Sequence, residues 1–565
     1  MISIRKIGVL GRTYRHLNRY RQILGVLFRY GFGDLVDTLK IEQYIEIGLK
    51  MISRKRRERI EKLSRSERVR MALEELGPTY IKFGQILSTR PDLVSVEFIN
   101  EFSKLQDKVP PFGYEEFKNT IEFELGQPVT AVFAELNPQP LASASIGQVH
   151  RARLHNGDEA AVKVRRPGIE KIVEVDLEIM LHLATLMEKH IEELALHRPV
   201  KIVEEFARTI AREMDYTVEA ASMERVAAQF LGDRSVYIPR VYRDYSTAVV
   251  LTSEYIEGIK VSKVEALCES GYNCKVITER GADILLKQIF AFGFFHADPH
   301  PGNIFVLPGE VIGLIDFGMM GSVDRGTREV FVGLVDSILQ RDDPRTARIL
   351  MDMTDWDEEP DAVQLEKDVA DFVARHLNKP LKELNLSKLL QQILETATRH
   401  RMRVRPDIFL MLKALAQIEG FARSLDPEFD MLGKAAPFIR NVKRARLAPG
   451  RVADDIAHLI EQGYTFLTDF PKELLEISRS LRQRKLAITL VLKDLDKMLH
   501  THDQISNRLS FSIIIAALII GSALIVISNM PPMFYGISMI GLIGFLTAAV
   551  LGIWLLIAII KKGRL

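Results

Sequence analysis

The chain has 565 residues, of which 76 are Lys or Arg and 74 are Asp or Glu, giving a formal net charge of +2. At roughly 100–200 residues per domain, this length allows two to four domains with cores of their own. The small net charge argues against a dedicated nucleic-acid-binding protein. The two cysteines, Cys268 and Cys274, are too few for a disulfide framework or a four-cysteine zinc site, so we expect reduced thiols.

The charge is distributed unevenly along the chain. Residues 1–70 carry a net charge of +11 and the remainder carries −9. Arginines such as Arg12, Arg15 and Arg19 alternate with apolar residues, which predicts a basic amphipathic segment over residues 1–70. Such a segment can lie on anionic lipid, act as a transit peptide or simply be a solvated helix face, and the pattern leaves all three open.

A lysine in an apolar strand is the first sign of chemistry. Residues 140–152 predict a loop between two strands, and Glu159-Ala-Ala-Val-Lys163-Val164 predicts a strand with one buried lysine. A buried ammonium is costly unless it meets a carboxylate or a phosphate. Glu213, Asp215 and Glu219, in the helical stretch 203–230, are candidate partners, whereas a strand-end lysine that reaches water is the alternative.

The strongest motif is His296-Ala-Asp298-Pro-His-Pro-Gly-Asn303, followed by Asp316-Phe-Gly318 after an apolar strand at 311–315. Phosphoryl transfer needs one carboxylate near the attacking hydroxyl and hard oxygen ligands for Mg²⁺. Asp298 fits the first role, and Asn303 with Asp316 fits the second. The order of lysine, His-x-Asp-x-x-x-x-Asn and Asp-Phe-Gly therefore predicts a kinase-like site that uses ATP and Mg²⁺.

Residues 341–499 read as helical, and their apolar periodicity predicts only a packing role.

The tail is different, because 509–560 contains no Asp, Glu, Lys or Arg. The runs 509–528 and 536–560 are each long enough to cross a bilayer, and an uncharged turn at 529–535 joins them. Basic residues flank both runs, so the positive-inside rule places both ends in the cytoplasm. Small residues recur four apart, Ala517 and Gly521 in the first run and Gly544, Ala548 and Gly552 in the second. This spacing permits close packing within the hairpin or between copies, which leaves a homodimer open.

The motifs together resemble the UbiB/ADCK-like atypical kinases. The family-specific marks are Lys82-Phe-Gly-Gln85, the alanine-rich loop Ala142-Ser-Ala-Ser145 and Glu213-Met-Asp215. The resemblance implies an α+β, bilobal protein-kinase-like fold with an N-terminal helical extension, a C-terminal helical region and two transmembrane helices. No Ala-Pro-Glu follows Asp316-Phe-Gly318, so no peptide-binding activation segment is expected.

The resemblance also implies roles for individual residues. Lys163 would hold the nucleotide phosphates and pair with Glu219, while Asp298 would accept a proton. Asn303 and Asp316 would hold Mg²⁺. Lys82 and Gln85 would fold over the site and meet Glu213 and Asp215, as regulatory residues. The residues expected to contact the nucleotide are Leu141, Ala142, Ser143, Ala144, Ser145, Ile146, Gly147, Gln148, Val149, Lys163, Glu254 and Ile256.

These expectations give a layout and a function. The predicted parts are a basic segment (1–70), a helical extension (71–135), an N-lobe (136–260), a catalytic C-lobe (261–345), a helical region (346–505) and a transmembrane hairpin (509–560). The resemblance implies an ATPase that supports ubiquinone biosynthesis at the bacterial inner membrane, facing the cytoplasm. Its expected partners are membrane lipid, polyprenyl-quinone precursors and quinone-biosynthesis enzymes, not nucleic acid. A small-molecule or lipid kinase and a nucleotide-dependent scaffold are the alternatives.

Overall fold

The computed structural model describes residues 14–33, 63–105, 109–191, 198–356, 359–376, 386–446, 495–528, 531–534 and 537–562. The chain divides into two compact units, Met1–Asp455 and Ile456–Leu565. Each unit is described by itself.

The N-lobe is an antiparallel sheet with the strand order β1-β2-β3-β5. Its strands are β1 (Phe133–Ser143), β2 (Gly147–Leu154), β3 (Glu159–Arg165) and β5 (Val250–Glu254). Along β3 the side chains of Ala160, Val162 and Val164 are buried and alternate with more exposed ones, the period of two that a strand with one buried face requires. The buried face packs with Phe117 and Ile121 of α7 (Tyr114–Leu125), and α8 (Val129–Val132) leads into β1. This small core holds the strand that carries Lys163.

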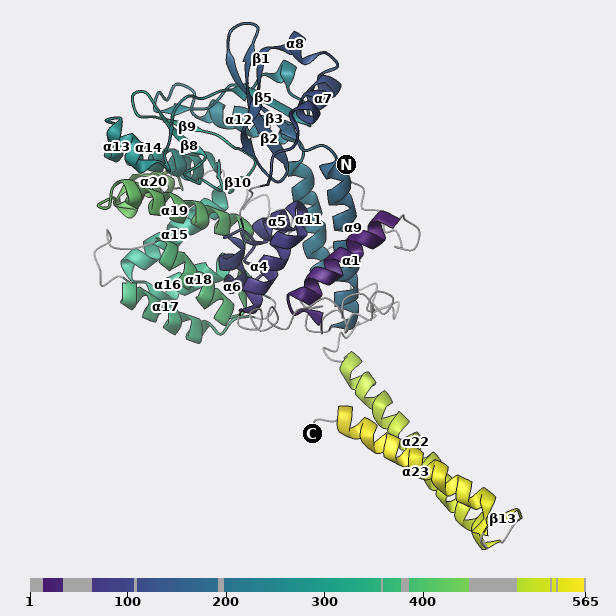
Figure 1. Ribbon diagram of the computed structural model, residues 1–565. Helices are drawn as coiled ribbons and strands as arrows, with labels where there is room; N and C mark the ends of the chain where they lie inside the picture. The colour runs from purple at the N-terminus through teal and green to yellow at the C-terminus, as the bar shows by residue number, and fades with distance from the viewer. Residues whose placement is uncertain are drawn as a thin grey trace, which may run out of the picture. The chain divides into compact units, whose positions relative to one another are not determined.

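A second core is built mainly from helices and joins two parts of the sequence (Figure 1). Its helices are α1 (Tyr14–Arg29), α4 (Arg65–Leu76), α5 (Pro78–Leu87), α6 (Val96–Phe102), α9 (Ile169–His190) and α11 (Pro199–Glu213). The last two lie between β3 and α12 (Tyr216–Gln229) in the chain, yet they pack with the N-terminal helices. The stretch 136–260, predicted as one lobe, thus supplies two helices to the core of the extension.

Helix α1 does not present its apolar face to solvent. Tyr20, Ile23 and Leu24 are buried in the helical core, and the Arg19 guanidinium donates to both oxygens of buried Asp176 at 2.7 and 3.0 Å. Of the three alternatives left open for residues 1–70, lying on lipid through the apolar face is not supported for residues 14–29, because intramolecular packing already covers that face.

The C-lobe carries the loop with Asp298 between short strands. Its sheet has the order β4-β9-β8-β6, and β7 pairs with β10. The strands are β4 (Val236–Tyr237), β6 (Ile259–Lys260), β7 (Phe294–His296), β8 (Ile304–Leu307), β9 (Val311–Leu314) and β10 (Met320–Ser322). The helices around them are α13 (Val264–Glu269), α14 (Cys274–Leu286), a π-helical segment (Lys287–Phe292) and α15 (Arg325–Gln340). Cys268 and Cys274 are free thiols with their sulfur atoms 3.6 Å apart.

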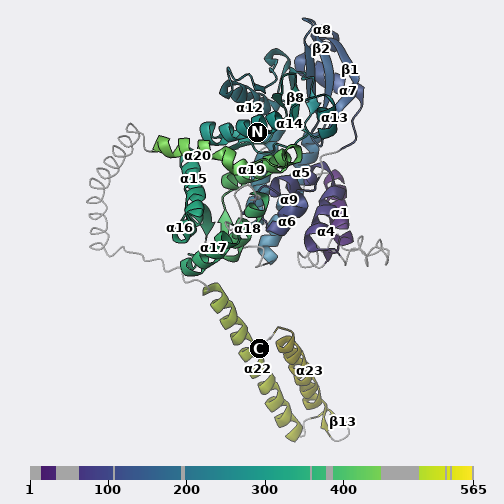
Figure 2. The same ribbon diagram turned by 90° about the vertical axis from the view of Figure 1, so that its left-hand side faces the viewer.

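The C-terminal helices share one core with the C-lobe. They are α16 (Asp343–Asp352), α17 (Ala362–His376), α18 (Leu386–Arg399), α19 (Pro406–Leu425) and α20 (Met431–Arg446), with β11 (Thr354–Trp356) paired to β12 (Met402–Val404). Ile408, Phe409 and Phe421 of α19 belong to the same buried cluster as Phe295 and Phe317 of the C-lobe. Helix α19 packs against α14, α18 and β10 and lies in the interior of the lobe (Figure 2).

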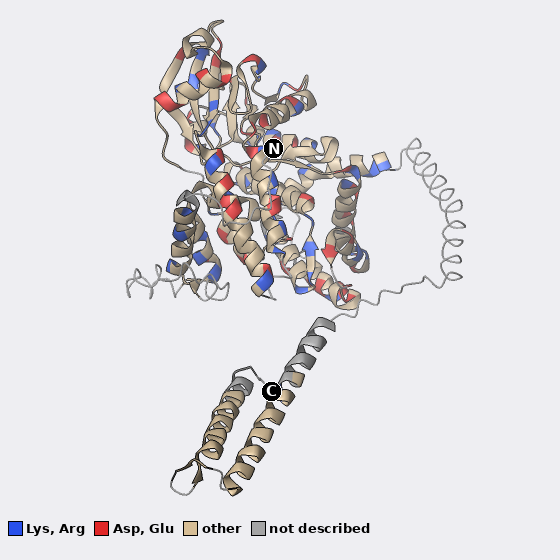
Figure 3. Cartoon of the chain, turned by 90° about the vertical axis from the view of Figure 1, so that its right-hand side faces the viewer, with Lys and Arg blue, Asp and Glu red and all other residues tan. Residues whose placement is uncertain are grey.

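The second unit is a helical hairpin. It consists of α22 (Leu495–Ile527), β13 (Met533–Phe534), β14 (Ile537–Ser538) and α23 (Met539–Lys562). By length and composition, Arg508–Ile527 and Met539–Leu556 are long and apolar enough to cross a membrane, and almost none of either is buried. The described parts of both helices carry no charged side chain between residues 509 and 556 (Figure 3). The two predicted runs thus form helices, and their exposure is unlike that of a hairpin buried in a soluble core.

The hairpin interface uses only some of the small residues noted in the sequence. A Cβ on Gly544 would lie 2.2 Å from the Ser522 hydroxyl, and one on Gly541 would lie 2.5 Å from Val526. Ala548 is buried, whereas Gly521 and Gly552 have nothing within 4 Å of an added Cβ. Close packing within the hairpin is therefore confirmed for Gly544 and Ala548, but not for Gly521 or Gly552.

Candidate functional site: a kinase-like phosphoryl-transfer centre

Lys163 of β3 and Glu219 of α12 form the first part of the site. The Lys163 ammonium donates to both carboxylate oxygens of Glu219, at 2.8 and 3.0 Å, and lies 3.8 Å from the Asp316 carboxylate. Asp215 caps the N-terminus of α12 by accepting from the Thr217 amide, which begins the helix one turn before Glu219. Burial alone would lower the pKa of Lys163, but Glu219 and Asp316 outweigh it and hold that pKa above its usual range. The ion pair expected from the resemblance is present.

Asp298, Asn303 and Asp316 lie on neighbouring turns that backbone hydrogen bonds connect. The antiparallel β8–β9 pair places Ile304 opposite Leu314, so Asn303 and Ile315 are also opposed, and the Ile315 amide donates to the Asn303 carbonyl at 3.0 Å. The Ala297 amide donates to the backbone carbonyl of Met319, the residue that follows Asp316-Phe-Gly318. The Asp298 amide donates to His296 Nδ1 at 3.2 Å. Residues 18 apart in sequence are thereby held at one edge of the C-lobe.

His300, in the turn between Asp298 and Asn303, uses its ring for a local contact. Its Nδ1 accepts from the Gly302 amide at 3.1 Å, and its backbone carbonyl accepts from Asn303 at 2.8 Å. Both bonds shape the turn between Asp298 and Asn303.

Asp316 has an uncommon backbone conformation. Its φ is +62°, in the left-handed region that non-glycine residues rarely adopt, and such conformations concentrate at functional sites. Its side chain is about half exposed. Burial opposes ionisation of this carboxyl, but Lys163, His296 and Lys82 outweigh it and hold the pKa of Asp316 below its usual range. The carboxylate is therefore ionised at neutral pH and can serve as a cation ligand.

The alanine-rich loop folds inward. The Ala144 amide donates to the Gly147 carbonyl at 2.8 Å, and the Arg166 amide donates to the Ile146 carbonyl at 2.7 Å. The loop residues 141–144 and Val149 are exposed or partly exposed. The remaining loop residues, 145–148, are buried. Ile146 belongs to the helical core of the extension.

Gln148 is already occupied by protein partners. Its side-chain oxygen Oε1 accepts from the Phe112 backbone amide at 2.9 Å, and its Nε2 lies 2.8 Å from His150 Nε2. In this loop, residues 141–144 and Val149 are thus the ones with exposed or partly exposed side chains.

The segment Glu254-Tyr255-Ile256 contains two of the expected nucleotide contacts, Glu254 and Ile256. The Glu254 amide donates to the Arg240 carbonyl at 2.8 Å, and the Tyr255 amide donates to the Glu159 carbonyl at 3.0 Å. Among the described residues, the Ile256 amide has no such partner. The Glu254 side chain accepts from the Tyr237 hydroxyl and the Arg240 amide, so both of its oxygens are already bonded within the protein. Ile256 is therefore the residue of this segment whose backbone amide is left to bond a nucleotide base.

The extension reaches the site through Lys82 of α5. Its ammonium lies 3.1 Å from the Glu213 carboxylate, both side chains are mostly buried, and its charge contributes to the low pKa of Asp316. Gln85 and Asp215 have other partners than those expected. Gln85 donates to the Leu105 carbonyl at 3.3 Å, and Asp215 accepts from Thr217. The expected contact between Gln85 and Asp215 is therefore not formed. Asp215 instead caps the N-terminus of α12, and Gln85 bonds the Leu105 carbonyl.

One contact was missed by the sequence analysis. The Gln417 amide, on α19, donates to Asp298 Oδ1 at 2.9 Å from 119 positions further along the chain. Lys413, one turn earlier on the same helix, is electrostatically coupled to Asp298. The expectation that residues 341–499 serve packing alone is therefore wrong for α19. No spacing rule could reveal it, because the two segments meet only through the tertiary fold.

The donor set fits magnesium. Mg²⁺ prefers hard oxygen ligands, and in nucleotide sites the protein usually supplies only one or two of them. Asn303 and Asp316 offer an amide and a carboxylate oxygen at the same sheet edge. Within the described ranges no group of three His, Cys, Asp or Glu side chains is placed to hold a metal by itself.

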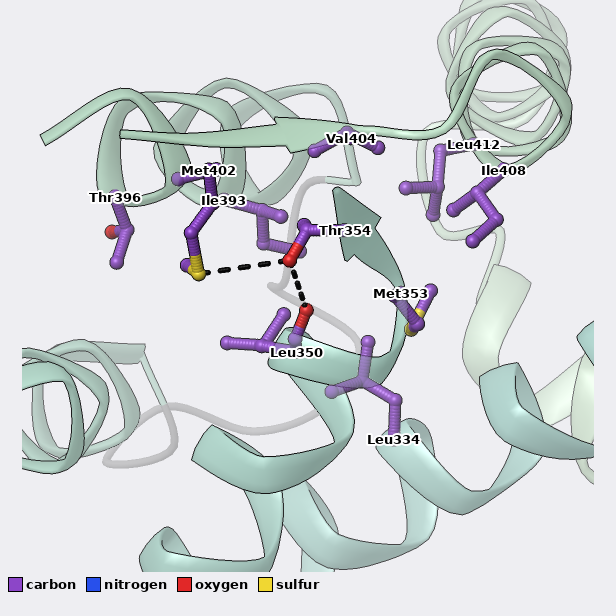
Figure 4. Close-up of a pocket in the computed structure, with 11 residues that line it drawn as sticks. Leu334, Leu350, Met353, Thr354, Ile393, Thr396, Met402, Val404, Ile408 and Leu412 are labelled. Carbon is purple, nitrogen blue, oxygen red and sulfur yellow. Dashed lines mark hydrogen bonds between the residues drawn. The ribbon is translucent and has the colours of Figure 1, made fainter. Parts of the chain in front are cut away.

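A small cavity in the C-terminal helices is unrelated to this site. Its volume is about 10 Å³, room for a single water, and its lining is mostly apolar (Figure 4). Thr354 Oγ1 is the central polar atom and is already bonded to the Leu350 carbonyl at 2.9 Å and the Met402 sulfur at 3.6 Å. The cavity is a packing void rather than a ligand site.

Three family models match parts of this chain. The model of the ABC1 atypical kinase-like domain matches residues 104–350, that of the UbiB helical domain matches 369–430, and that of the ABC1/UbiB kinase-like C-terminal domain matches 493–561. A relative from Marinobacter nauticus called "Probable protein kinase UbiB" is 39% identical over 392 residues, covering 69% of this chain and 72% of its own.

A relative of the same name from Pseudomonas fluorescens is 36% identical over 469 residues, covering 81% of this chain and 87% of its own. Among solved structures, the complex of Rv3197 with erythromycin from Mycobacterium tuberculosis is 21% identical, with a TM-score of 0.45 and coverage of 56% of this chain and 80% of that one. The predicted family and its mixed kinase-like fold are thus confirmed: the chain belongs to the ABC1/UbiB family of atypical kinases.

Proposed function

We propose that this protein binds ATP with Mg²⁺ between its two lobes and hydrolyses it, in support of ubiquinone biosynthesis. The observation that carries the proposal is the position of the Lys163 ammonium, which lies 2.8 Å from the Glu219 carboxylate and 3.8 Å from that of Asp316. Backbone hydrogen bonds connect the turn of Asp316 to the loop that contains Asp298 and Asn303. In kinase-like sites this set positions the phosphates and the nucleophile.

Each residue has one task in this proposal. Lys163, fixed by Glu219, binds phosphate oxygens, and Asp298 accepts the proton of the nucleophile. Asn303 and Asp316 would hold Mg²⁺, which neutralises charge on the phosphates when bound. The exposed side chains of Leu141 and Ala142, and the amide of Ile256, contribute to nucleotide binding.

The short segment after Asp316 favours an acceptor other than a protein. Helix α15 is capped by Asp324 and begins at Arg325, and β10 occupies residues 320–322 of the intervening chain. Little chain remains for the long loop on which a peptide substrate would lie. A water molecule or a small acceptor needs no such loop.

The quinone and membrane parts of the proposal have separate support. The relatives carry the name UbiB, and two apolar helices follow the catalytic unit. Ubiquinone precursors are polyprenylated and partition into bilayers, so an enzyme that serves them must meet a membrane surface. We place the protein in the bacterial inner membrane with its catalytic unit in the cytoplasm. Lipid, polyprenyl-quinone precursors and quinone-biosynthesis enzymes are its proposed partners.

Tracing the γ-phosphate tests the function. Full-length protein in anionic liposomes is given γ-labelled ATP, Mg²⁺ and phenolic quinone precursors, and Asp298→Asn serves as the inactive control. The proposal expects label in free phosphate, reduced roughly 100-fold or more in Asp298→Asn. Label on a lipid or phenol would show a kinase instead, and nucleotide binding without any turnover would show a scaffold.

A further inference from the structure

The amide of Gln417 lies against Asp298 in a fixed orientation. The distance between Gln417 Nε2 and Asp298 Oδ1 is 2.9 Å. An ionised carboxylate can only accept hydrogen bonds, so the NH₂ group of the amide must face Asp298 and the oxygen Oε1 must point elsewhere. The contact itself therefore fixes which end of the amide is which.

The other end of this amide lacks a donor. Gln417 Oε1 is buried, and nothing in the described part of the chain donates a hydrogen bond to it. A buried acceptor without a partner costs about 1–3 kcal/mol and so calls for an explanation, such as a ligand that completes the bond. The nitrogen and oxygen of a carboxamide are about 2.3 Å apart, which puts Oε1 roughly 5 Å or less from Oδ1. One water can bridge that span with two hydrogen bonds of about 2.8 Å.

Two acceptors side by side favour water as the nucleophile. A water molecule has two protons and can donate to the Asp298 carboxylate and to Gln417 Oε1 at once. The hydroxyl of an alcohol or a phenol has one proton and would leave one of these acceptors unsatisfied. Lys413, one turn before Gln417 on α19, interacts electrostatically with Asp298, so a second side chain of this helix faces the same carboxylate.

We propose that Gln417 is the water-positioning residue of this site: its amide nitrogen orients Asp298 and its Oε1 binds the attacking water. This inference rests on the proposed ATPase function and deepens it. The water oxygen forms a bond to the γ-phosphorus while the bond to the β–γ bridging oxygen breaks, and ADP leaves with that electron pair. Asp298 takes one water proton, and the proton held by Gln417 remains on the phosphate product.

The test compares phosphate release by the full-length protein in liposomes with that of three variants. Gln417→Leu removes both polar ends of the amide. Gln340→Leu is the matched control, because Gln340 of α15 makes the same type of amide–carboxylate bond, 3.0 Å to Asp336, on an exposed surface. Gln417→Glu keeps an acceptor oxygen but places a second negative charge beside Asp298.

The expected result is a split between turnover and binding. Gln417→Leu should lower kcat for phosphate release roughly 10- to 100-fold, with KM for ATP and the melting temperature little changed, whereas Gln340→Leu should match the parent. In Gln417→Glu the like charge disfavours ionised Asp298, so the acidic limb of the kcat profile should move to higher pH. The shift tests the contact between residue 417 and Asp298, and the loss of kcat at constant KM in Gln417→Leu tests the positioning of water.

Two kinds of outcome would overturn the inference. If the parent releases phosphate and Gln417→Leu keeps its kcat, or if Gln417→Glu leaves the pH profile unmoved, Gln417 does not position the water and the ATPase function stands. If the parent itself releases no phosphate, or transfers it only to an added acceptor, the ATPase proposal and this inference both fail. Measuring the parent first distinguishes the two cases.

Discussion

At Gly147 the site tolerates no side chain. A Cβ there would lie 2.1 Å from the Tyr216 hydroxyl and 2.9 Å from the Val164 carbonyl, because β2, β3 and the start of α12 meet at this point. Burial raises the pKa of Tyr216 to about 12, and its hydroxyl has no partner among the described residues. The Tyr216 ring also lies 5.1 Å below the Lys163 ammonium, a cation–π contact. Gly147 thus lets an aromatic ring reach the phosphate-binding lysine.

Gly147→Ala should lower stability by about 1–3 kcal/mol and weaken nucleotide binding, because the new methyl group must displace Tyr216. Adding Tyr216→Phe removes the atom in closest conflict and should restore part of the loss, although the Val164 carbonyl remains close. Thermal unfolding and ATP binding measure both effects. Gly113→Ala, where nothing lies within 4 Å of the added Cβ, is the control. A double variant no better than Gly147→Ala would contradict the role given to Tyr216.

At the scale of elements, α5 acts on the site through charge. Lys82 pairs with Glu213 of α11 and also contributes to the low pKa of Asp316. A group with a depressed pKa keeps its charge above its ordinary titration range and loses it only as the pH falls through the lower, folded-state value. The extension therefore helps to keep the cation ligand ionised under mildly acidic conditions.

Replacing Lys82 by Met should raise the pKa of Asp316, since one of the charges that stabilise its carboxylate is lost. On acidification, Mg²⁺-dependent nucleotide binding should then weaken at a higher pH than in the parent. Binding titrations across the acidic range measure this shift. Lys82→Arg retains the charge and should keep the parental profile, and a Lys82→Met profile that coincides with the parent would refute the coupling.

The hairpin offers a matched pair of glycines on one helix. Gly544 of α23 faces the Ser522 hydroxyl, where an added Cβ would lie 2.2 Å away, whereas Gly552 has open space. Gly544→Leu should separate α22 from α23 and lower the melting temperature of the detergent-solubilised protein, and Gly552→Leu should change it little. Equal effects of the two substitutions would mean that the helices do not pack as described.

At the scale of the whole molecule, the flanking charges predict a topology. Arg508 precedes the first span, and Lys561, Lys562 and Arg564 follow the second. The positive-inside rule then places the short connection with Met533 outside the cytoplasm.

In a background with Cys268→Ser and Cys274→Ser, a cysteine introduced at Met533 should react with a membrane-impermeant maleimide in intact spheroplasts. A cysteine introduced at Ser506 should react only after lysis. Labelling of both positions, or of Ser506 alone, before lysis would reverse or exclude the proposed orientation.

The order of motifs along the chain was enough to predict the central part of the site. Lys163, Asp298, Asn303 and Asp316 follow the order and spacing of a kinase-like site, and the uncharged run 509–560 is long enough for two helices that could each cross a bilayer. These features are local or ordered along the chain, so the sequence alone determines them.

Contacts between distant segments were decided only by the tertiary structure. Nothing in the pattern of α1 distinguishes an apolar face that meets lipid from one that meets α4 and α9, because both environments favour the same residues. Likewise, Gln417 looks like any polar residue on an amphipathic helix until α19 packs into the C-lobe and brings it 2.9 Å from Asp298. The sequence by itself determined the order of the site motifs and the two long apolar helices, whereas packing of segments more than 100 residues apart decided which further side chains lie beside those motifs.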